Sequence, residues 1–305
     1  MIVVQRAPAY ATVQDLGRTG FRASGVPGSG AIDRIALATL NVMVGNDRND
    51  AGIELALTGG AFVFDSASVF AIGGAEVLAS LNETSLETYR VYRANAGETL
   101  SVEKITSGRF AYLAVMGGID TPMVLGSRST YGPGGLGGYN GRRLKSCDEL
   151  SVGTHKSVRR HHVMDSLPAT LRPSADMNEI RFIVRAGVSA EEVAGEYRLS
   201  PSSDRTGYRL DGNPRTSGAS VTSEPVCPGV IQLPTNGEPI VLMADAPTIG
   251  GYRVMGGVIT ADLGILAQKN PGDTIALAPI SVERAQREND RLAEVETLIE
   301  EWCLS

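Results

Sequence analysis

The sequence predicts a mainly β protein with a few helices. Glycine is frequent, at 36 of 305 residues, and recurs as doublets such as those at 59–60, 117–118 and 250–251. Short runs rich in Val, Ile, Phe and Leu lie between these glycines, and helix-like patterns are confined to three segments. Many short apolar runs bounded by turn residues are typical of strands joined by tight turns.

The predicted strands occur along the whole chain. The clearest apolar runs lie at 61–64, 69–72, 110–115, 181–184 and 240–243. Each has the length of a strand and is bounded by Gly, Asp or Pro, which interrupt regular structure. We therefore expect sheets in both the N-terminal and the C-terminal half.

Two of the helices are predicted from their capping residues. Asp33 can accept a hydrogen bond at the start of 34–44, whose apolar positions follow helical spacing and which ends at a glycine. Ser189 and Glu192 have the spacing of a capping box, which predicts a second helix running toward Tyr197.

The chain is predicted to divide into two halves. The segment 154–178 begins with a basic, polar stretch and continues with prolines, which is typical of a connector. It separates an N-terminal half, 1–153, from a C-terminal half, 179–305. A third, charged helix is expected at the end of the second half, from a cap at Ser281 to about Trp302.

Charge, hydropathy and cysteine content indicate which partners and which cellular compartment to expect. The formal net charge is -6 and the pI about 5.3, which argues against nucleic acid or an anionic membrane surface as the main partner. The sequence shows neither a signal peptide nor an apolar stretch long enough to span a membrane. Cys147, Cys227 and Cys303 are odd in number and far apart, so a reducing cytoplasm is expected.

The first candidate site motif is T-V-Q-D-L-G-R, followed by a Gly-rich stretch. It brings an amide, a carboxylate and a guanidinium together at Gln14, Asp15 and Arg18. The arginine can grip a carboxylate or phosphate with two hydrogen bonds. The alternative is structural, with Asp15 and Arg18 paired to pin the loop.

A second motif combines hydroxyls, an arginine and a glycine-rich loop. Ser127, Arg128 and Ser129 lead into the glycines of 132–138, whose backbone N–H groups can cradle an anion. The Lys-Ser/Thr step of a P-loop is missing. A surface loop without a ligand is the alternative.

The densest cluster of polar residues lies at 202–209 in the second half. Arg205 and Arg209 form a candidate anion clamp, which Asp204 can orient and which Ser203 and Tyr208 can complete. Charge-rich clusters are also common on solvated faces, and this alternative stays open.

Three further residues and one absence complete the list of candidates. Asp245 follows an apolar strand and is either a site carboxylate or half of a buried ion pair. Gln232 lies in an apolar strand and needs a hydrogen-bonding partner, and Tyr252 follows a glycine doublet. Glu54, also within a strand, is a catalytic base only in the less common interpretation. No zinc-binding histidine pattern, G-x-S-x-G motif or Rossmann glycine fingerprint is present, so no metal site is expected.

Together these segments resemble the biotin-dependent carboxyltransferase-like family, also labelled allophanate hydrolase subunit 2 or the C subunit of 5-oxoprolinase. The resemblance extends over nearly the whole chain. It is carried by T-V-Q-D-L-G-R at 12–18, G-V-P-G-S-G-A-I-D at 25–33, V-G-N at 44–46, L-G-S-R-S-T-Y at 125–131, S-D-R-T-G-Y-R-L at 203–210, P-G-V-I-Q-L-P at 228–234 and G-G-Y at 250–252. The chain departs from the usual pattern at Thr206, where Met is common, and at 186–188, where Gly-Pro is common.

The resemblance implies a fold of two cyclophilin-like β-barrel halves. It also implies a partner, the B-type or subunit 1 protein, and an A-type hydrolase in the 5-oxoprolinase system. ATP would be used by the assembly. No lysine has the flanking methionines of a biotin-acceptor site, so this chain is expected to bind no cofactor covalently, and biotin matters only for carboxyl transfer.

Three functions are carried forward. The first is the C subunit of an ATP-dependent 5-oxoprolinase, an enzyme component that binds a small amide or carboxylate substrate. In it, Arg205 and Arg209 would hold a carboxylate or phosphorylated intermediate, and Asp204 and Asp245 would orient them or handle protons. Gln14 and the motif residues beside it would complete the pocket. The second is a carboxyltransferase acting on urea-like substrates, and the third is a non-catalytic regulator of the partner.

Overall fold

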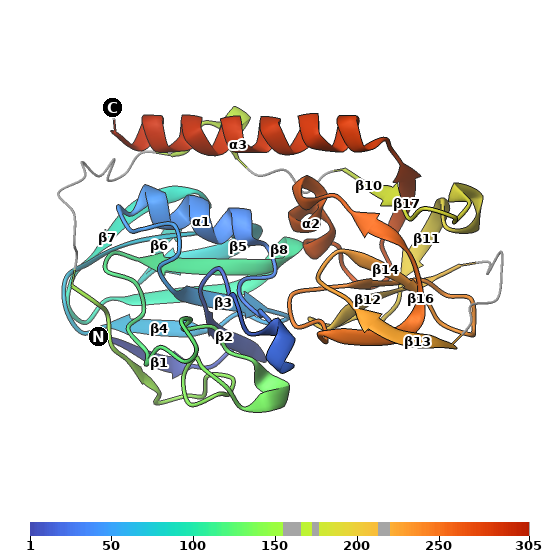
Figure 1. Cartoon of the computed structure of the whole chain (residues 1–305). Coiled ribbons are helices and arrows are strands. Elements are labelled where there is room, and N and C mark those ends of the chain that lie inside the picture. The colour runs from blue at the N-terminus through green and yellow to red at the C-terminus, as the bar shows by residue number, and fades with distance from the viewer. Residues whose placement is uncertain (155–165, 173–176, 213–219, 305) are drawn as a thin grey trace. The chain divides into compact units, whose positions relative to one another are not determined.

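Strands dominate both parts of the chain in the computed structural model, which describes residues 1–154, 166–172, 177–212 and 220–304 (Figure 1). The chain forms two compact units. Unit 1 comprises Met1–Arg18, Ser29–Pro173 and Val295–Ser305, and unit 2 comprises Thr19–Gly28 and Ser174–Glu294. The units are therefore discontinuous in sequence, whereas the predicted halves are continuous. Of the predicted connector, 155–165 and 173–176 lie outside the described residues.

Unit 1 is a curled half-barrel sheet. Its path runs β2-β3-β8-β4-β1-β9, and β5 adds to β8 and pairs with β6 and β7. The strands are β1 (Ile2–Arg6), β2 (Tyr10–Gln14), β3 (Gly52–Ala56), β4 (Ala61–Phe64), β5 (Ser68–Leu81), β6 (Thr84–Leu86), β7 (Arg90–Ala94), β8 (Thr99–Val115) and β9 (Glu149–Leu150). The register between β5 and β8 shifts at three irregularities. Such bulges bend a strand and increase its twist, so these two long strands can follow the curl of the sheet.

The first helix of unit 1 forms as predicted. α1 (Arg34–Met43) packs on β5 and β8 (Figure 1). The Asp33 carboxylate caps it by accepting a hydrogen bond from the Ala36 N–H at 3.1 Å. Leu37 and Leu40 are completely buried, because the apolar face of the helix covers the sheet.

Unit 2 is a closed barrel of seven strands. The ring runs β10-β17-β11-β12-β15-β14-β16 and closes because β16 also pairs with β10, while β13 pairs with β16 outside the ring. These strands are β10 (Glu179–Val184), β11 (Gly195–Leu199), β12 (Gly207–Asp211), β13 (Ser220–Pro225), β14 (Val230–Leu233), β15 (Ile240–Leu242), β16 (Ile249–Val258) and β17 (Thr274–Pro279). The mainly β prediction is confirmed. Four of the five clearest predicted strand segments lie within strands, and the fifth, 240–243, extends one residue beyond β15.

The second predicted helix is wrong in length. The capping box at Ser189 and Glu192 forms, but it opens only the 3-10 turn η4 (Ala190–Glu192). The following residues enter β11, where Tyr197 pairs with Ile275 of β17 and its ring is buried. Pairing and burial in the barrel therefore outweigh a local start signal for a helix. The other 3-10 turns are η1 (Arg22–Ser24), η2 (Gly132–Gly134) and η3 (Ala169–Leu171).

One helix of unit 2 lies between β16 and β17. α2 (Thr260–Ala267) escapes prediction, because its short, mostly apolar sequence contains a glycine and lacks an amphipathic stripe. Its Asp262 carboxylate is buried and accepts hydrogen bonds from Arg181 Nη2 at 2.6 Å and Nε at 3.0 Å. These hydrogen bonds raise the pKa of the Arg181 guanidinium, so this pair holds α2 against β10 as an ion pair.

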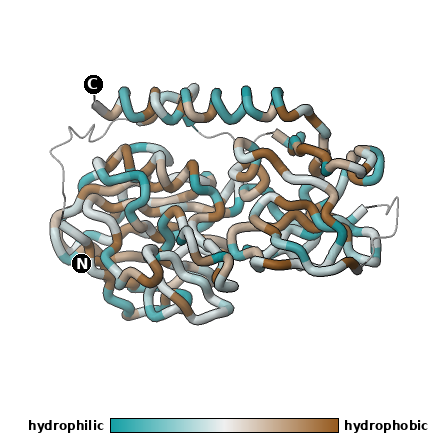
Figure 2. The backbone as a smooth tube through the Cα atoms, viewed as in Figure 1, coloured by the Kyte–Doolittle hydropathy of each residue, from teal (hydrophilic) through white to brown (hydrophobic). Residues whose placement is uncertain are grey.

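The predicted last helix is confirmed as α3 (Val282–Leu304). It is largely hydrophilic along its length, whereas apolar residues concentrate in the strands (Figure 2). Within unit 1, its end is bound by Arg48, whose guanidinium lies 2.5 Å from Glu296 and 3.2 Å from Glu300. None of the helices in the described ranges is long and apolar enough to cross a membrane.

Candidate functional site

The two predicted loop motifs of unit 1 meet at the buried carboxylate of Asp15. Its Oδ1 accepts hydrogen bonds from Ser127 Oγ at 2.7 Å, from the Gly17 N–H at 2.8 Å and from Ser129 Oγ. Its Oδ2 accepts from the Arg128 N–H at 2.6 Å. Four donors thus surround one carboxylate that is 1% exposed. Asp15 joins segments that lie more than a hundred residues apart and fixes both loops.

Arg18 and Gln14 flank this carboxylate and are also buried. Arg18 Nη2 donates to the Ser129 carbonyl oxygen at 2.5 Å. Gln14 Nε2 donates to Thr12 Oγ1 at 3.0 Å and to the Thr130 carbonyl oxygen at 3.2 Å. Gln14 Oε1 is buried without a hydrogen-bond partner among the described residues. The structure therefore brings together all six site residues that the sequence predicts for unit 1.

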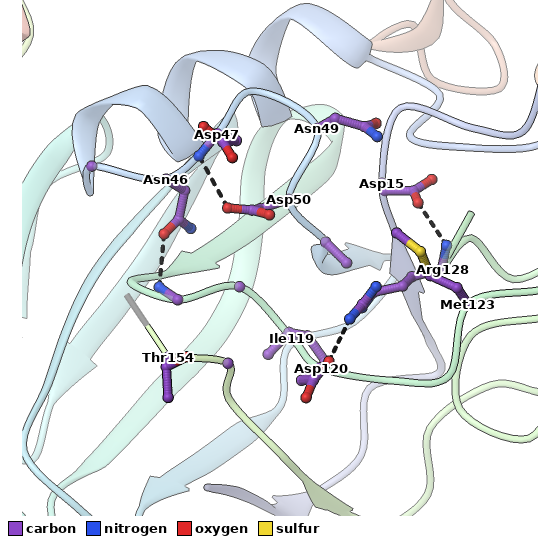
Figure 3. Close-up of a pocket in the computed structure, with 15 residues that line it drawn as sticks. Asp15, Asn46, Asp47, Asn49, Asp50, Ile119, Asp120, Met123, Arg128 and Thr154 are labelled. Atoms are coloured by element: carbon purple, nitrogen blue, oxygen red, sulfur yellow. Dashed lines mark hydrogen bonds and ion pairs between the residues drawn. The ribbon is translucent and has the colours of Figure 1, made fainter. Parts of the chain in front are cut away.

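A pocket of about 350 Å³ lies beside this network (Figure 3). Asp47, Asp50 and Asp120 line it with carboxylates, and Arg128 contributes the only guanidinium among the described residues of the lining. That guanidinium forms an ion pair with Asp120, and Asn46 Oδ1 accepts a hydrogen bond from a backbone amide of the wall at 2.7 Å. The lining is thus acidic and rich in acceptors. It suits a small ligand that carries N–H donors better than it suits an anion.

The predicted catalytic residues of unit 2 form a structural network. Arg205 Nε and Nη2 donate to the two Asp245 carboxylate oxygens at 2.9 and 3.1 Å, and both side chains are more than nine-tenths buried. The Asp204 carboxylate is exposed and accepts from the N–H groups of Thr206 at 2.8 Å and Gly207 at 3.2 Å. Asp245 therefore forms a buried ion pair with Arg205, which is one of the two interpretations that the sequence left open for it. Asp204 instead stabilises the turn at Thr206 and Gly207. Their catalytic roles stay predictions.

The remaining members of the 202–209 cluster point in different directions. Tyr208 is completely buried, and its hydroxyl donates to the Ala267 carbonyl oxygen at 2.8 Å. Its neighbour Arg209 is exposed, because successive residues of a strand face opposite sides. Ser203 Oγ accepts from the Arg209 N–H at 2.9 Å. Arg205 is buried and paired with Asp245, whereas Arg209 is the exposed arginine of the cluster.

Gln232 and its neighbours retain unused hydrogen-bonding capacity. Gln232 lies on β14, is 4% exposed, and its Nε2 has no hydrogen-bond partner within the described ranges. A Cβ at Gly250 would lie 2.3 Å from this nitrogen, so only glycine leaves room for the amide. Tyr252, two residues further along β16, is 41% exposed. Gln232 is thus a buried predicted residue of unit 2 whose side-chain donor has no partner among the described residues.

Sequence reasoning missed how the G-S-G-A-I-D loop is held. Glu54 is completely buried, and its Oε2 accepts from Tyr112 Oη and from the Ile32 N–H, both at 2.9 Å. The Glu54 carboxylate is therefore paired, as the commoner interpretation of a strand carboxylate predicts. The loop also contains Ser29, whose buried Oγ has no hydrogen-bond partner among the described residues. The glycines on both sides of Ser29 were the sequence feature that could have indicated this position.

Comparisons with known proteins agree with this fold. Residues 24–279 match the family model described as carboxyltransferase domain, subdomain A and B. The chain is 39% identical over 289 residues to the C subunit of 5-oxoprolinase from Escherichia coli (strain K12), covering 93% of each chain. It is 34% identical over 303 residues to the urea amidolyase of Saccharomyces cerevisiae, covering 91% of this chain but 16% of that protein.

A solved structure extends the comparison to three dimensions. The Kluyveromyces lactis urea carboxylase superposes with a TM-score of 0.87 at 30% identity, covering 100% of this chain and 29% of that one. These matches confirm the resemblance that the sequence motifs indicate. The chain belongs to the family of carboxyltransferase domains with subdomains A and B.

Proposed function

We propose that this chain is the C subunit of an ATP-dependent 5-oxoprolinase. In this reaction water adds across the lactam C–N bond of 5-oxo-L-proline to give L-glutamate, while ATP is hydrolysed to ADP and phosphate. The 39% identity to the C subunit of a 5-oxoprolinase, with 93% of both chains covered, carries the proposal. A second protein of that description, from Haemophilus influenzae, is 33% identical and 94% covered. The yeast urea amidolyase, by contrast, is a far longer protein.

The assembly would include a B-type partner and an A-type hydrolase. The described side chains of this chain support a division of labour. The buried carboxylates Asp15 and Asp245 are each bound by protein donors, and Asp204 caps a turn. In this structure these carboxylates hold loops and turns in place through their hydrogen bonds. We therefore assign substrate binding to this chain, and ATP use and much of the chemistry to its partners.

A carboxyltransferase acting on urea-like substrates is the second candidate. The family description and the similarity to urea carboxylase favour it. The acceptor-rich pocket at Asp47 and Asp50 is also suited to urea, whose nitrogens carry four N–H donors. In that case biotin would be carried by another protein or domain.

Reconstitution distinguishes the candidates. The chain is co-expressed with its B-type and A-type partners, and glutamate and ADP are measured after addition of 5-oxo-L-proline and ATP. A parallel reaction supplies urea, bicarbonate, ATP and a biotin-carrying partner. Turnover of 5-oxoproline that requires every component supports the proposal. Urea-dependent turnover alone supports the second candidate, and a complex inactive on both that still alters its partner's signalling supports a regulator.

The exposed arginine of unit 2 provides a residue-level check within the same assay. Arg209→Ala is expected to raise the KM for 5-oxo-L-proline about tenfold or more, because a charged hydrogen bond to the substrate carboxylate contributes roughly 1.5–3 kcal/mol. Arg93→Ala removes the same charge from an exposed position on β7 and serves as the matched control. A normal KM in Arg209→Ala would remove this residue from the site.

A further inference from the structure

Ser29 is held in an unfavourable backbone conformation. Its φ is +53°, in the left-handed region that favours glycine, and glycines stand on both sides of it. The residue is 8% exposed, and its Oγ is buried without a hydrogen-bond partner among the described residues. A buried hydroxyl without a partner is itself unfavourable. Ser29 therefore combines two local costs at one position.

The surrounding loop imposes this conformation. Three consecutive backbone amides after Ser29 each donate to a buried acceptor: Ala31 N to Asp15 O at 2.8 Å, Ile32 N to Glu54 Oε2 at 2.9 Å, and Asp33 N to Tyr112 Oη at 2.9 Å. Strained residues persist where neighbouring contacts determine their geometry in this way. The backbone that follows Ser29 is therefore held in place.

The loop also lies directly on the Asp15–Arg18 turn. A Cβ at Gly30 would lie 2.7 Å from Gly17 N and 2.8 Å from Gly17 Cα, so only glycine permits this approach. The loop that carries Ser29 is thus joined to the Asp15–Arg18 turn of unit 1, through the Ala31 N–H and the close approach of Gly30 to Gly17. A structural role alone would be better served by glycine at position 29, because glycine adopts positive φ without the steric cost.

We propose that Ser29 is a substrate-binding residue whose hydroxyl donates a hydrogen bond to the amide or carboxylate oxygen of the substrate. The proposal rests on the proposed function and deepens it. A ligand oxygen would satisfy the unpaired donor. The hydroxyl binds and orients, and it forms no covalent bond.

Two substitutions separate binding from structure. Ser29→Gly removes the hydroxyl and relieves the backbone strain, whereas Ser29→Ala removes the hydroxyl and keeps the strain. In the reconstituted complex, both variants are expected to raise the KM for 5-oxo-L-proline about five- to 150-fold, the range for leaving a polar partner unsatisfied. The Tm of Ser29→Gly should equal or exceed that of the wild type. Leu57→Gly relieves similar strain at an exposed residue with φ +72° and serves as the control.

The outcomes identify which idea fails. A KM within twofold of the wild type in both variants overturns the role of Ser29 and leaves the proposed function intact. If the wild-type complex does not turn over 5-oxoproline, the proposed function fails, and thermal shifts of the complex with 5-oxo-L-proline, L-glutamate and urea test Ser29 separately. A shift that Ser29→Ala abolishes and Leu57→Gly retains supports the proposal. The same shift in Ser29→Ala, or no shift in the wild type, overturns it.

Discussion

Asp15 is expected to be among the most sensitive residues of unit 1. Its carboxylate accepts four hydrogen bonds, two from the hydroxyls of Ser127 and Ser129 and two from the N–H groups of Gly17 and Arg128. Asp15→Ala leaves two buried hydroxyls and two partly buried N–H groups without an acceptor. At about 1–3 kcal/mol for each buried hydroxyl, this predicts a loss of about 2–6 kcal/mol. Asp15→Asn retains one oxygen for three donors but turns an NH₂ group toward the Arg128 N–H. One unsatisfied contact predicts a smaller loss of about 1–3 kcal/mol.

Urea denaturation followed by tryptophan fluorescence measures this effect. The chain has a single tryptophan, Trp302, and it lies in the Val295–Ser305 segment of unit 1. Asp47→Asn makes the same chemical change at an exposed position of the neighbouring pocket and should lower stability by less than about 0.5 kcal/mol. The reasoning is refuted if Asp15→Ala stays within about 1 kcal/mol of the wild type, or if the Asp15→Asn and Asp47→Asn variants lose equal amounts.

Three further predictions concern ion pairs. Arg205→Ala and Asp245→Ala should each cost about 3–5 kcal/mol and the double variant less than their sum, whereas additive losses in a double-mutant cycle would contradict a direct pair. Hydrogen bonds from Arg142 hold the pKa of Asp148 below its ordinary value. The stability that this pair contributes is complete above the unfolded-state pKa of about 3.9 and is lost as pH falls through the folded-state pKa. The urea midpoints of Asp148→Asn and of the wild type should therefore converge on acidification. A difference between the two midpoints that stays constant with pH would contradict this prediction. Arg48→Ala should accelerate hydrogen exchange several-fold at the end of α3, since exposed pairs contribute about 0.5–1 kcal/mol, and unchanged exchange would show that the pairs contribute nothing there.

Local sequence signals predicted elements well where local and tertiary preferences agree. Asp33 caps α1 because the apolar face that follows it also covers the sheet. At Ser189 the cap forms in the same way, but the chain then enters the barrel as β11, and only one turn of helix remains. α2 was not predicted, because its helical form depends on burial and on the Asp262–Arg181 pair rather than on the periodicity of its sequence. Pairings of this kind join distant residues and leave no local signal.

The same distinction applies to the candidate site. The motifs at Asp15 and at 127–129 were chosen for the residue types that they contain, and the structure joins them into one network. What could not be predicted is how the charges are used. Whether Arg205 faces a ligand or Asp245 depends on a turn forty positions away in the sequence. Whether Arg209 is accessible depends on which face of β12 turns outward.

The hydrogen-bonding state of the motif residues indicates which of them can contact a ligand. The buried charged groups of its motifs are bound to protein partners, and removing those partners would cost more than a substrate could return. The polar atoms that remain unpaired within the described residues include Ser29 Oγ and Gln232 Nε2, each beside a glycine that makes room for it or for its loop. Violations of local rules tend to mark functional positions, because a fold retains an unfavourable arrangement only when something offsets it. The buried charged residues of the motifs therefore build the loops, and the exposed Arg209 and the neutral hydroxyl and amide groups are the better candidates for contact with a small amide substrate.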